Sequence, residues 1–483
     1  MEALDWLVIG VFFLALIGII VWVVRQKQND SADYFLGGRD ATWLAIGASI
    51  FASNIGSEHL IGLAGAGASS GMAMAHWEIQ GWMILILGWV FVPFYTRSMV
   101  YTMPEFLERR YNPQSRTILS VISLVSYVLT KVAVTVYAGG LVFQQVFGIK
   151  ELWGIDFFWI AAIGLVVLTA LYTIFGGMKS VLYTSVLQTP ILLLGSLIIL
   201  VLGFKELGGW DEMMRVCGAV TVNDYGDTMT NLIRSNDDAN FPWLGALIGS
   251  AIIGFWYWCT DQFIVQRVLS GKNEMEARRG TIFGAYLKLL PVFLFLIPGM
   301  IAFALHQKYI GAGGEGFLPM LANGTANADA AFPTLVAKLL PAGVKGLVVC
   351  GILAALMSSL ASLFNSSAML FTIDFYKRFR PETPEKKLVG IGQVATVVIV
   401  ILGILWIPIM RSVGDVLYTY LQDVQSVLAP GIAAAFLLGI CWKRTSAQGG
   451  MWGLIAGMVI GLTRLGAKVY YSNAGEVADS TFK

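Results

Sequence analysis

Apolar residues occur along this chain in twelve long stretches that polar segments separate. A helix needs about 20 apolar residues to cross the roughly 30 Å hydrocarbon core of a bilayer, whereas the strands of a membrane barrel alternate over about ten residues. The stretches have the helical length and do not alternate, so they predict membrane-spanning helices. They lie near residues 5–24, 42–66, 78–98, 117–146, 155–176, 181–203, 243–266, 281–305, 342–374, 388–408, 416–441 and 449–467.

Two of these spans, the second and the seventh, carry polar and charged residues at a depth where a membrane helix is expected to be apolar. The second contains the run from Ser53 to His59, and the seventh contains the run from Gly254 to Gln262. Unwound backbone inside a membrane is tolerated only where it faces protein or a water-filled cavity. Both spans are therefore predicted to be broken helices that line an internal site.

The two interrupted spans are five spans apart, which is typical of two five-helix repeats that each begin with a broken helix. We therefore predict an all-α polytopic membrane protein with one extra helix before this core and at least one after it. The predicted segments are an extra N-terminal helix with a cytoplasmic linker (1–41), a first repeat (42–203), an extracellular loop (204–242), a second repeat (243–441), and a further helix with the C-terminal tail (442–483).

Lysine and arginine are divided unevenly between the connecting segments. Alternate segments, beginning with the one after the first span, hold most of them, including Arg109, Arg110, Arg278 and Arg279. Because cytoplasmic loops carry the excess of basic residues, the N-terminus and the long loops near 204–242 and 306–341 are predicted to lie outside the cell.

Composition agrees with a membrane bundle. Of the 483 residues, 57% are hydrophobic and only 13% are charged, about half the charged share of soluble domains. The net charge of +2 gives no reason to expect a nucleic-acid partner. The sequence has no nucleotide-binding or metalloprotease motif and no nucleophile–base arrangement, so an enzyme is the least favoured class and no organic cofactor is expected.

Charged residues within the spans need a partner or a function, because each costs about 2.5–3.5 kcal/mol at the bilayer centre on insertion scales. Glu78 opens the third span between Trp77 and Trp82. It is either an interfacial glutamate in a tryptophan belt or a ligand for the hydroxyls of a sugar that stacks on aromatic rings. Lys288, in the eighth span, either extends to the inner membrane surface or contacts a ligand. Lys131 is more typical of a structural partner.

Neutral polar residues in the spans have two interpretations each. The small-residue face around Ser358 and Ser359 is typical of helix packing, and its hydroxyls, with free carbonyls at the break in the second span, also suit a dehydrated sodium ion. Gln422 either forms an interhelical hydrogen bond or serves a substrate hydroxyl. His59 is either a buried, hydrogen-bonded histidine or part of the site.

Short motifs, spread in order over nearly the whole chain, resemble those of the sodium/glucose cotransporter branch of the sodium/solute symporters. They occupy residues Asp33–Arg39, Ile46–Ser57, Gly62–Gly65, Tyr101–Glu105, Trp256–Gln262, Val265–Arg267, Leu287–Leu289, Met357–Ser359, Phe364–Ser366, Phe371–Asp374 and Phe436–Arg444.

The resemblance implies a LeuT-type inverted-repeat fold and two adjoining sites. It implies a sugar pocket, with Tyr257 as its gate toward the cytoplasm, at the positions of Asn54, His59, Glu78, Tyr257, Trp258, Lys288 and Gln422. It also implies a sodium site made of backbone carbonyls and two hydroxyls, at Ala52, Ile55, Ala355, Ser358 and Ser359.

The chain departs from the family pattern at one position. Relatives often carry an aspartate where this chain has Ser185, and that aspartate contributes to a second sodium site in some members, beside the serine that matches Ser362. Ser185 has no carboxylate. A second sodium site at Ser185 and Ser362 is therefore not expected, and we expect one sodium per sugar.

These observations predict a multi-pass symporter of the cell membrane that couples inward sodium flow to the uptake of a glucose- or galactose-type hexose by alternating access. The expected partners are a sodium ion, a small-molecule sugar and the surrounding lipid bilayer, and no obligate protein partner is expected. Two alternatives stay open, a sodium/myo-inositol (polyol) symporter and a sugar sensor built on a transporter fold. Proton coupling is disfavoured because Ser358 and Ser359 offer no titratable carboxylate.

Overall fold

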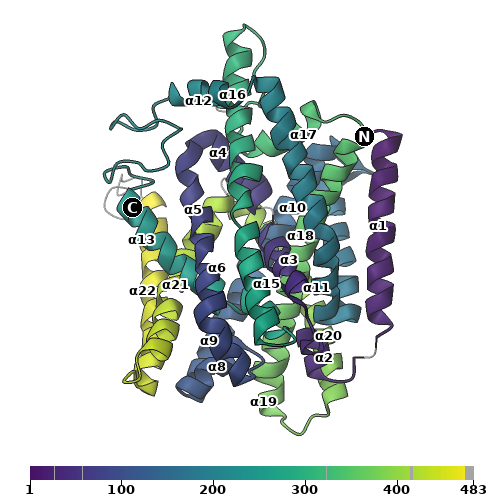
Figure 1. The fold of residues 1–483 in the computed structure, drawn as a ribbon, viewed down its shortest axis with the longest axis vertical. Coiled ribbons are helices and arrows are strands. Elements are labelled where there is room, and N and C mark those ends of the chain that lie inside the picture. Colours follow the sequence, from purple (N-terminus) through teal and green to yellow (C-terminus); the bar gives the residue numbers. More distant parts are fainter. Residues whose placement is uncertain (27, 57, 322–323, 414–416, 474–483) are drawn as a thin grey trace.

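The structure is a computed structural model that describes residues 1–26, 28–56, 58–321, 324–413 and 417–473, and for some residues inside helices it describes the backbone alone. Figure 1 shows long helices that run along one common direction, with the N-terminus and the segments around α12 and α17 near the same end. The strands of the described residues, β1 (Glu151–Leu152) and β2 (Ile155–Asp156), form one short antiparallel pair.

The helices follow one another with few and mostly short interruptions. The α-helices are α1 (Ala3–Val24), α2 (Ser31–Leu36), α3 (Trp43–Asn54), α4 (Ala64–Ser70), α5 (His76–Ile79), α6 (Met83–Ile86), α7 (Val92–Ser98), α8 (Met103–Arg110), α9 (Pro113–Ser126), α10 (Ala133–Phe147), α11 (Phe157–Leu207), α12 (Trp210–Gly218), α13 (Trp243–Gly254), α14 (Gln262–Leu269), α15 (Glu274–Leu287), α16 (Ile297–Gly311), α17 (Ala331–Leu339), α18 (Val344–Met369), α19 (Lys377–Phe379), α20 (Glu385–Val413), α21 (Leu417–Cys441) and α22 (Ala447–Asn473).

Short segments of tighter or wider helix join several of them. The 3-10 segments are η1 (Gly37–Arg39), η3 (Gly71–Ala75), η4 (Gln80–Trp82) and η9 (Ala328–Ala330). The π-helical segments are η2 (Glu58–Leu63), η5 (Leu87–Phe91), η6 (Tyr127–Val132), η7 (Phe255–Thr260), η8 (Val292–Leu296) and η10 (Leu370–Tyr376).

The helices account for all twelve predicted apolar stretches. Within the described residues, nine helical runs are long and apolar enough to cross a membrane, and two shorter apolar helices, Trp43–Asn54 and Gln425–Cys441, accompany them. The long helix α11 contains two of the predicted spans, separated at Gly177, whose φ of 54° and ψ of −149° are not helical. The division into repeats at 42–203 and 243–441 stays a prediction.

Both spans that were predicted to be broken are interrupted. The helix α3 ends at Asn54, and Ile55 is extended with ψ of 98° before the chain continues into η2 and α4. In the seventh span, Asp261 is extended with ψ of 127° between η7 and α14. The Asp261 carboxylate accepts a hydrogen bond from the backbone amide of Phe263 at 3.2 Å and so caps the new helix.

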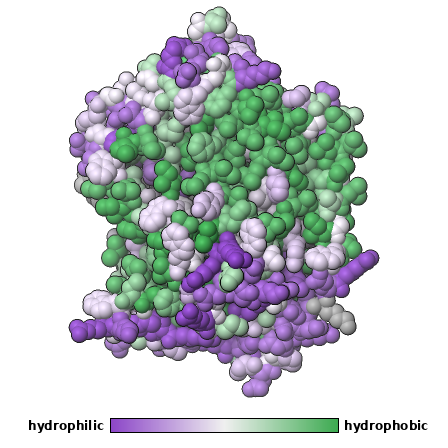
Figure 2. All heavy atoms as spheres, in the orientation of Figure 1, coloured by the Kyte–Doolittle hydropathy of each residue, from purple (hydrophilic) through white to green (hydrophobic). Residues whose placement is uncertain are grey.

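Side chains divide the molecule into an apolar belt and polar ends. In Figure 2, hydrophobic residues cover the middle of the visible face and hydrophilic residues gather at both ends. The run from α18 to α19 is the most enclosed of the apolar helical runs described, and almost all of the α18 side chains are buried. The serines of α18 therefore face other helices rather than lipid.

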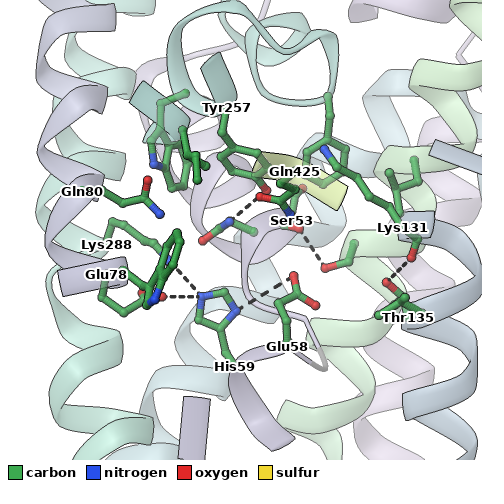
Figure 3. A pocket seen from close by; sticks show the side chains of 18 residues that line it. Ser53, Glu58, His59, Glu78, Gln80, Lys131, Thr135, Tyr257, Lys288 and Gln425 are labelled. Carbon is green, nitrogen blue, oxygen red and sulfur yellow. Dashed lines mark hydrogen bonds and ion pairs between the residues drawn. The ribbon is translucent and has the colours of Figure 1, made fainter. Parts of the chain in front are cut away.

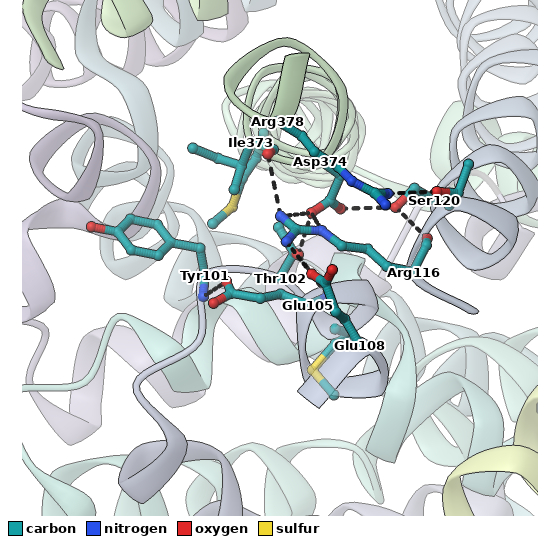
Figure 4. Close-up of polar contacts among 12 residues, drawn as sticks. Tyr101, Thr102, Glu105, Glu108, Arg116, Ser120, Ile373, Asp374 and Arg378 are labelled. Carbon is teal, nitrogen blue, oxygen red and sulfur yellow. Dashed lines mark hydrogen bonds and ion pairs between the residues drawn. The ribbon is translucent and has the colours of Figure 1, made fainter. Parts of the chain in front are cut away.

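A polar network ties the segment after the third span to the end of the ninth (Figure 4). The Asp374 carboxylate accepts hydrogen bonds from the hydroxyl of Thr102 at 2.8 Å and from the hydroxyl of Ser120 at 3.0 Å. The Arg116 guanidinium pairs with Asp374 at 2.6 Å and with Glu108 at 2.6 Å. This network fixes α8 and α9 against η10, at the end of the bundle opposite the N-terminus.

Candidate functional site

A cavity lies where the two broken spans meet the third, fourth, eighth, ninth and eleventh spans. Its volume is about 60 Å³, which is enough for a few water molecules. Six of the seven predicted sugar-site residues line it, and so does one of the predicted sodium ligands, Ser359. The lining residues are Ser53, Asn54, Glu58, His59, Trp77, Glu78, Gln80, Lys131, Val134, Thr135, Ile253, Tyr257, Trp258, Phe263, Lys288, Ser359, Leu363 and Gln425.

A charged cluster forms one wall of this cavity (Figure 3). The Nζ of Lys288 lies 2.6 Å from the Oε2 of Glu78 and 2.8 Å from the Nε2 of His59. The same imidazole nitrogen lies 3.2 Å from the Oε1 of Glu78. Glu78 and Lys288 are only 4% and 3% exposed, so neither is an interfacial residue and Lys288 does not extend to the membrane surface.

Aromatic residues of η7 form a second wall. The rings of Tyr257 and Trp258 contact edge to face, with centroids 4.9 Å apart. The hydroxyl of Tyr257 accepts a hydrogen bond from the Nδ2 of Asn54 at 2.9 Å, which joins the two broken spans. The ammonium of Lys288 lies 5.6 Å from the centre of a Trp258 ring. Apolar ring faces therefore adjoin hydrogen-bonding groups, an arrangement that suits a polyhydroxylated ring.

The predicted sodium ligands meet beside this cavity. The Ser359 hydroxyl donates to the backbone carbonyl of Ser53 at 2.8 Å, and the Ser358 hydroxyl lies 3.4 Å from that of Ser53. The last carbonyls of a helix have no intrahelical partner, and at the end of α3 these include the carbonyl of Ala52, with Ile55 next to them at the break. Ala355 lies one turn before Ser359 on α18 and is buried. These contacts bring span two and span nine together, and the role of their oxygens as sodium ligands stays a prediction.

The two residues considered for a second ion, Ser185 and Ser362, lie in the same hydroxyl cluster. The Oγ of Ser362 is 2.7 Å from that of Ser53, and the Oγ of Ser185 is 3.2 Å from that of Ser358. The cluster also contains a cation of the protein itself, because the Nε of Arg267 donates at 3.2 Å to Ser53. Sequence reasoning missed this arginine, although its motif was noted.

Gln422 is the one predicted sugar-site residue whose position in the site cannot be described. It lies on α21, and its side chain is outside the described part of the structure. Gln425, one turn later on the same helix, lines the cavity. The eleventh span therefore contributes the side-chain amide of Gln425 to the lining of the cavity.

Several cavity residues were not among the predicted site residues. Glu58 lies in the noted run of the second span, and Gln80 follows Glu78 by two positions, so a polar residue inside an apolar stretch was the available signal. Lys131, interpreted as a structural partner, forms an ion pair with Asp261 at 2.6 Å and also lines the cavity. Nothing in the sequence connects positions 131 and 261, because their contact depends on how spans four and seven pack.

The sequence matches known transporters over most of its length. The family model of the sodium:solute symporter family matches residues 34–457. The sodium/myo-inositol cotransporter 2 of Homo sapiens is 38% identical over 479 residues, which cover 96% of this chain and 70% of that protein. The sodium/glucose cotransporter 4 of Mus musculus is 38% identical over 482 residues, which cover 97% of this chain and 69% of that protein.

Solved structures show the same fold. A sodium-coupled sialic acid symporter in a substrate-bound outward-open state matches with a TM-score of 0.77 and 22% identity, over 96% of this chain and 98% of that one. MhsT in complex with L-phenylalanine matches with a TM-score of 0.54 and 12% identity, over 88% of this chain and 98% of that one. The predicted LeuT-type fold is confirmed.

Proposed function

The chain belongs to the sodium:solute symporter family, and we propose that the solute it takes up with sodium is a hexose of the glucose or galactose type. Membership makes it a sodium-coupled, multi-pass transporter of the plasma membrane rather than an enzyme.

One observation carries the proposal: the hydroxyl cluster and the cluster of charged and aromatic side chains share one cavity. Ser53 and Ser359 line the same space as Glu78 and Lys288. The carboxylate and ammonium supply hydrogen bonds to sugar hydroxyls, and Trp258 supplies an apolar face for the C–H side of the ring. An ion held between Ser359 and the end of α3 would stiffen the wall against which the sugar binds.

Coupling follows from differential binding to two states. Sodium favours the outward-open state only as far as it binds that state better, and the substrate then binds with the affinity of the organised cavity. In the proposed cycle, Tyr257 closes the cavity toward the cytoplasm until the bundle moves. The membrane potential adds about 2.3 kcal/mol for each charge that crosses 100 mV.

We further propose that one sodium accompanies each sugar, and Arg267 supports this. Its side chain is 1% exposed, and its Nε lies 3.2 Å from Ser53, whose hydroxyl is 2.7 Å from Ser362. Repulsion between unit charges about 6 Å apart is about 3 kcal/mol at an effective dielectric constant of 20. Any ion in this hydroxyl cluster meets that repulsion from the guanidinium, and a second ion at Ser185 and Ser362 would be repelled by the first ion as well. No carboxylate at position 185 offsets that repulsion.

Uptake of myo-inositol is the second candidate, because relatives with that name are as similar to this chain as those named for glucose. The sodium/myo-inositol cotransporter 2 of Homo sapiens and the sodium/glucose cotransporter 4 of Mus musculus are both 38% identical to it. Both substrates are rings that carry several hydroxyls, and the cavity offers donors and acceptors that fit either.

Uptake by proteoliposomes tests the proposal. We expect radiolabelled D-glucose or D-galactose to accumulate only under an inward sodium gradient, with myo-inositol as a weaker competitor. Preferred accumulation of myo-inositol would replace the hexose by the polyol. Substrate binding without sodium-dependent uptake would identify a sensor instead. The sodium flux per sugar, measured in the same vesicles, is expected to be one, and a value of two would contradict the role given to Arg267.

A further inference from the structure

Gln80 is a cavity residue that neither the sequence motifs nor the proposed function provides with a role. We propose that Gln80 binds a hydroxyl of the substrate and thereby determines part of the substrate preference, and that Gly254 makes the room in which its amide lies. This inference rests on the proposed function, because it adds a substrate ligand to the same cavity.

Gln80 reaches the cavity from the charged wall. It begins η4 within the third span, two positions after Glu78, and the side chains of Trp77, Glu78 and Gln80 all line the cavity. In Figure 3 the Gln80 amide extends toward the cavity from the same side as Lys288 and Glu78. A substrate that contacts Glu78 and Lys288 would therefore have Gln80 beside it.

The Gln80 carbonyl is buried without a hydrogen-bond partner among the described residues. Three other cavity residues have a buried atom without a hydrogen-bond partner among the described residues, the Oδ1 of Asn54, the Nδ1 of His59 and the Oε2 of Glu78, the last of which is held in the ion pair with Lys288. All three residues occupy positions at which the family resemblance implies sugar contact. A buried acceptor that stays unpaired is destabilising, and a substrate hydroxyl that donates to it removes the penalty.

Gly254, in the seventh span, leaves the space that the Gln80 amide occupies. A Cβ at Gly254 would lie 2.8 Å from the Oε1 of Gln80, and 3.2 Å from both the Cβ of Gln80 and the Cγ of Met83. Any larger residue at position 254 would push the Gln80 amide away. The third and seventh spans are thus fitted to each other at this point, one turn before Tyr257 in η7.

The chemistry of the carbonyl restricts what it can recognise. An Oε1 acceptor needs a donor, which a free hydroxyl provides and the ring oxygen of a pyranose does not. The ring position that faces Gln80 must therefore carry a hydroxyl. A monodeoxy analogue that lacks this hydroxyl leaves the carbonyl unpaired and is expected to bind about 5- to 100-fold more weakly than the parent sugar.

The test is the competition of monodeoxy analogues with radiolabelled D-glucose, D-galactose or myo-inositol, whichever the wild type accumulates. Gln80→Met keeps the length of the side chain and removes the amide. We expect wild-type protein to discriminate against one analogue about 5- to 100-fold and Gln80→Met to lose that discrimination while it keeps the others. Gln188→Met is the matched control, because Gln188 is buried on α11 with an amide that has no hydrogen-bond partner among the described residues and does not line the cavity.

A second variant tests the same contact by a change in the seventh span. Gly254→Ala is expected to weaken discrimination against the same analogue, because its methyl group displaces the amide. Gly249→Ala on the same helix is the control, since a Cβ at Gly249 would have no neighbour within 4 Å. If Gln80→Met does not reach the membrane, Gly254→Ala still tests whether the Gln80 amide contacts the substrate.

Unchanged discrimination in both Gln80→Met and Gly254→Ala, with sodium-driven uptake intact, would overturn the inference. Equal weakening for the parent sugar and every analogue would overturn it as well, because it would show a general change of the cavity. Failure of the wild type to accumulate any of the three radiolabelled substrates would instead contradict the proposed function.

Discussion

Removal of the Ser359 hydroxyl tests the predicted sodium site. This side chain is 3% exposed, lines the cavity, and donates to the carbonyl of Ser53 at the break in the second span. In Ser359→Ala the ion loses one of its five proposed oxygen ligands. The groups of the substrate wall, Glu78 and Lys288, are left unchanged.

The expected effect follows from the energy of a polar contact with a charged group, about 1.5–3 kcal/mol. This corresponds to a factor of about 10 to 150 in sodium affinity. We therefore expect the sodium concentration for half-maximal uptake to rise by one to two orders of magnitude. The order of preference among competing sugars, measured at saturating sodium, is expected to stay that of the wild type.

The same helix provides a matched control. Ser367 is fully buried on α18, two turns further along, and its hydroxyl has no hydrogen-bond partner among the described residues. Ser367→Ala is expected to leave the sodium dependence unchanged. Wild-type sodium dependence in Ser359→Ala, or an equal shift in Ser367→Ala, would refute the assignment of the ion to this face of α18.

Three further variants test the substrate wall and its support. Glu78→Gln is expected to abolish substrate binding, as measured by titration calorimetry. The change leaves the Lys288 ammonium as a buried charge without an ion-pair partner, at a cost of about 3–5 kcal/mol. A substrate affinity near that of the wild type would contradict this expectation. Gln422→Ala is expected to lose substrate affinity and keep sodium affinity, and wild-type sugar binding by the purified variant would exclude Gln422 from the site. Lys131→Met is expected to lower the melting temperature in detergent more than the double variant Lys131→Met/Asp261→Asn. The single change leaves the Asp261 carboxylate buried without its partner, whereas the double change removes both members of the pair. Equal decreases in melting temperature would show that the ion pair does not contribute to stability.

The interruptions of the second and seventh spans were predictable, because polar groups at membrane depth are costly however the spans pack. Which residues in each span leave the helical conformation was not predictable. Asp261 ends η7 because its carboxylate caps the helix that follows, and this is visible only once the start of α14 at Gln262 is known. The polar pattern indicated Ile55 only as part of a longer run, and the family resemblance was needed to name it as a carbonyl ligand.

Interactions between distant segments explain most of what the sequence left undecided. Lys288 looked equally suited to the membrane surface and to a ligand, and its contacts with Glu78 and His59 decide between the surface and the interior. The motifs that contain Thr102 and Asp374 were noticed separately, and the structure shows that they bond to each other across 272 positions of sequence. Spacing along the chain has no information about such pairs, because they depend on how whole spans pack.

The charges around the cavity fit the proposal that a neutral sugar is taken up together with a cation. Among the described lining residues, the carboxylates of Glu58 and Glu78 equal the ammonium groups of Lys131 and Lys288 in number. Beside the lining, the carboxylate of Asp261 and the guanidinium of Arg267 are again one charge of each sign. A neutral sugar adds no charge to this balanced wall, and its hydroxyls can insert among the existing ion pairs without leaving a bare charge. A sodium ion beside Ser359, coordinated by uncharged oxygens, would then be the one charge that binding of the two ligands adds to the site. In the proposed cycle the energy of the membrane potential would therefore act on the ion, and it would reach the sugar only through the wall that the two ligands share.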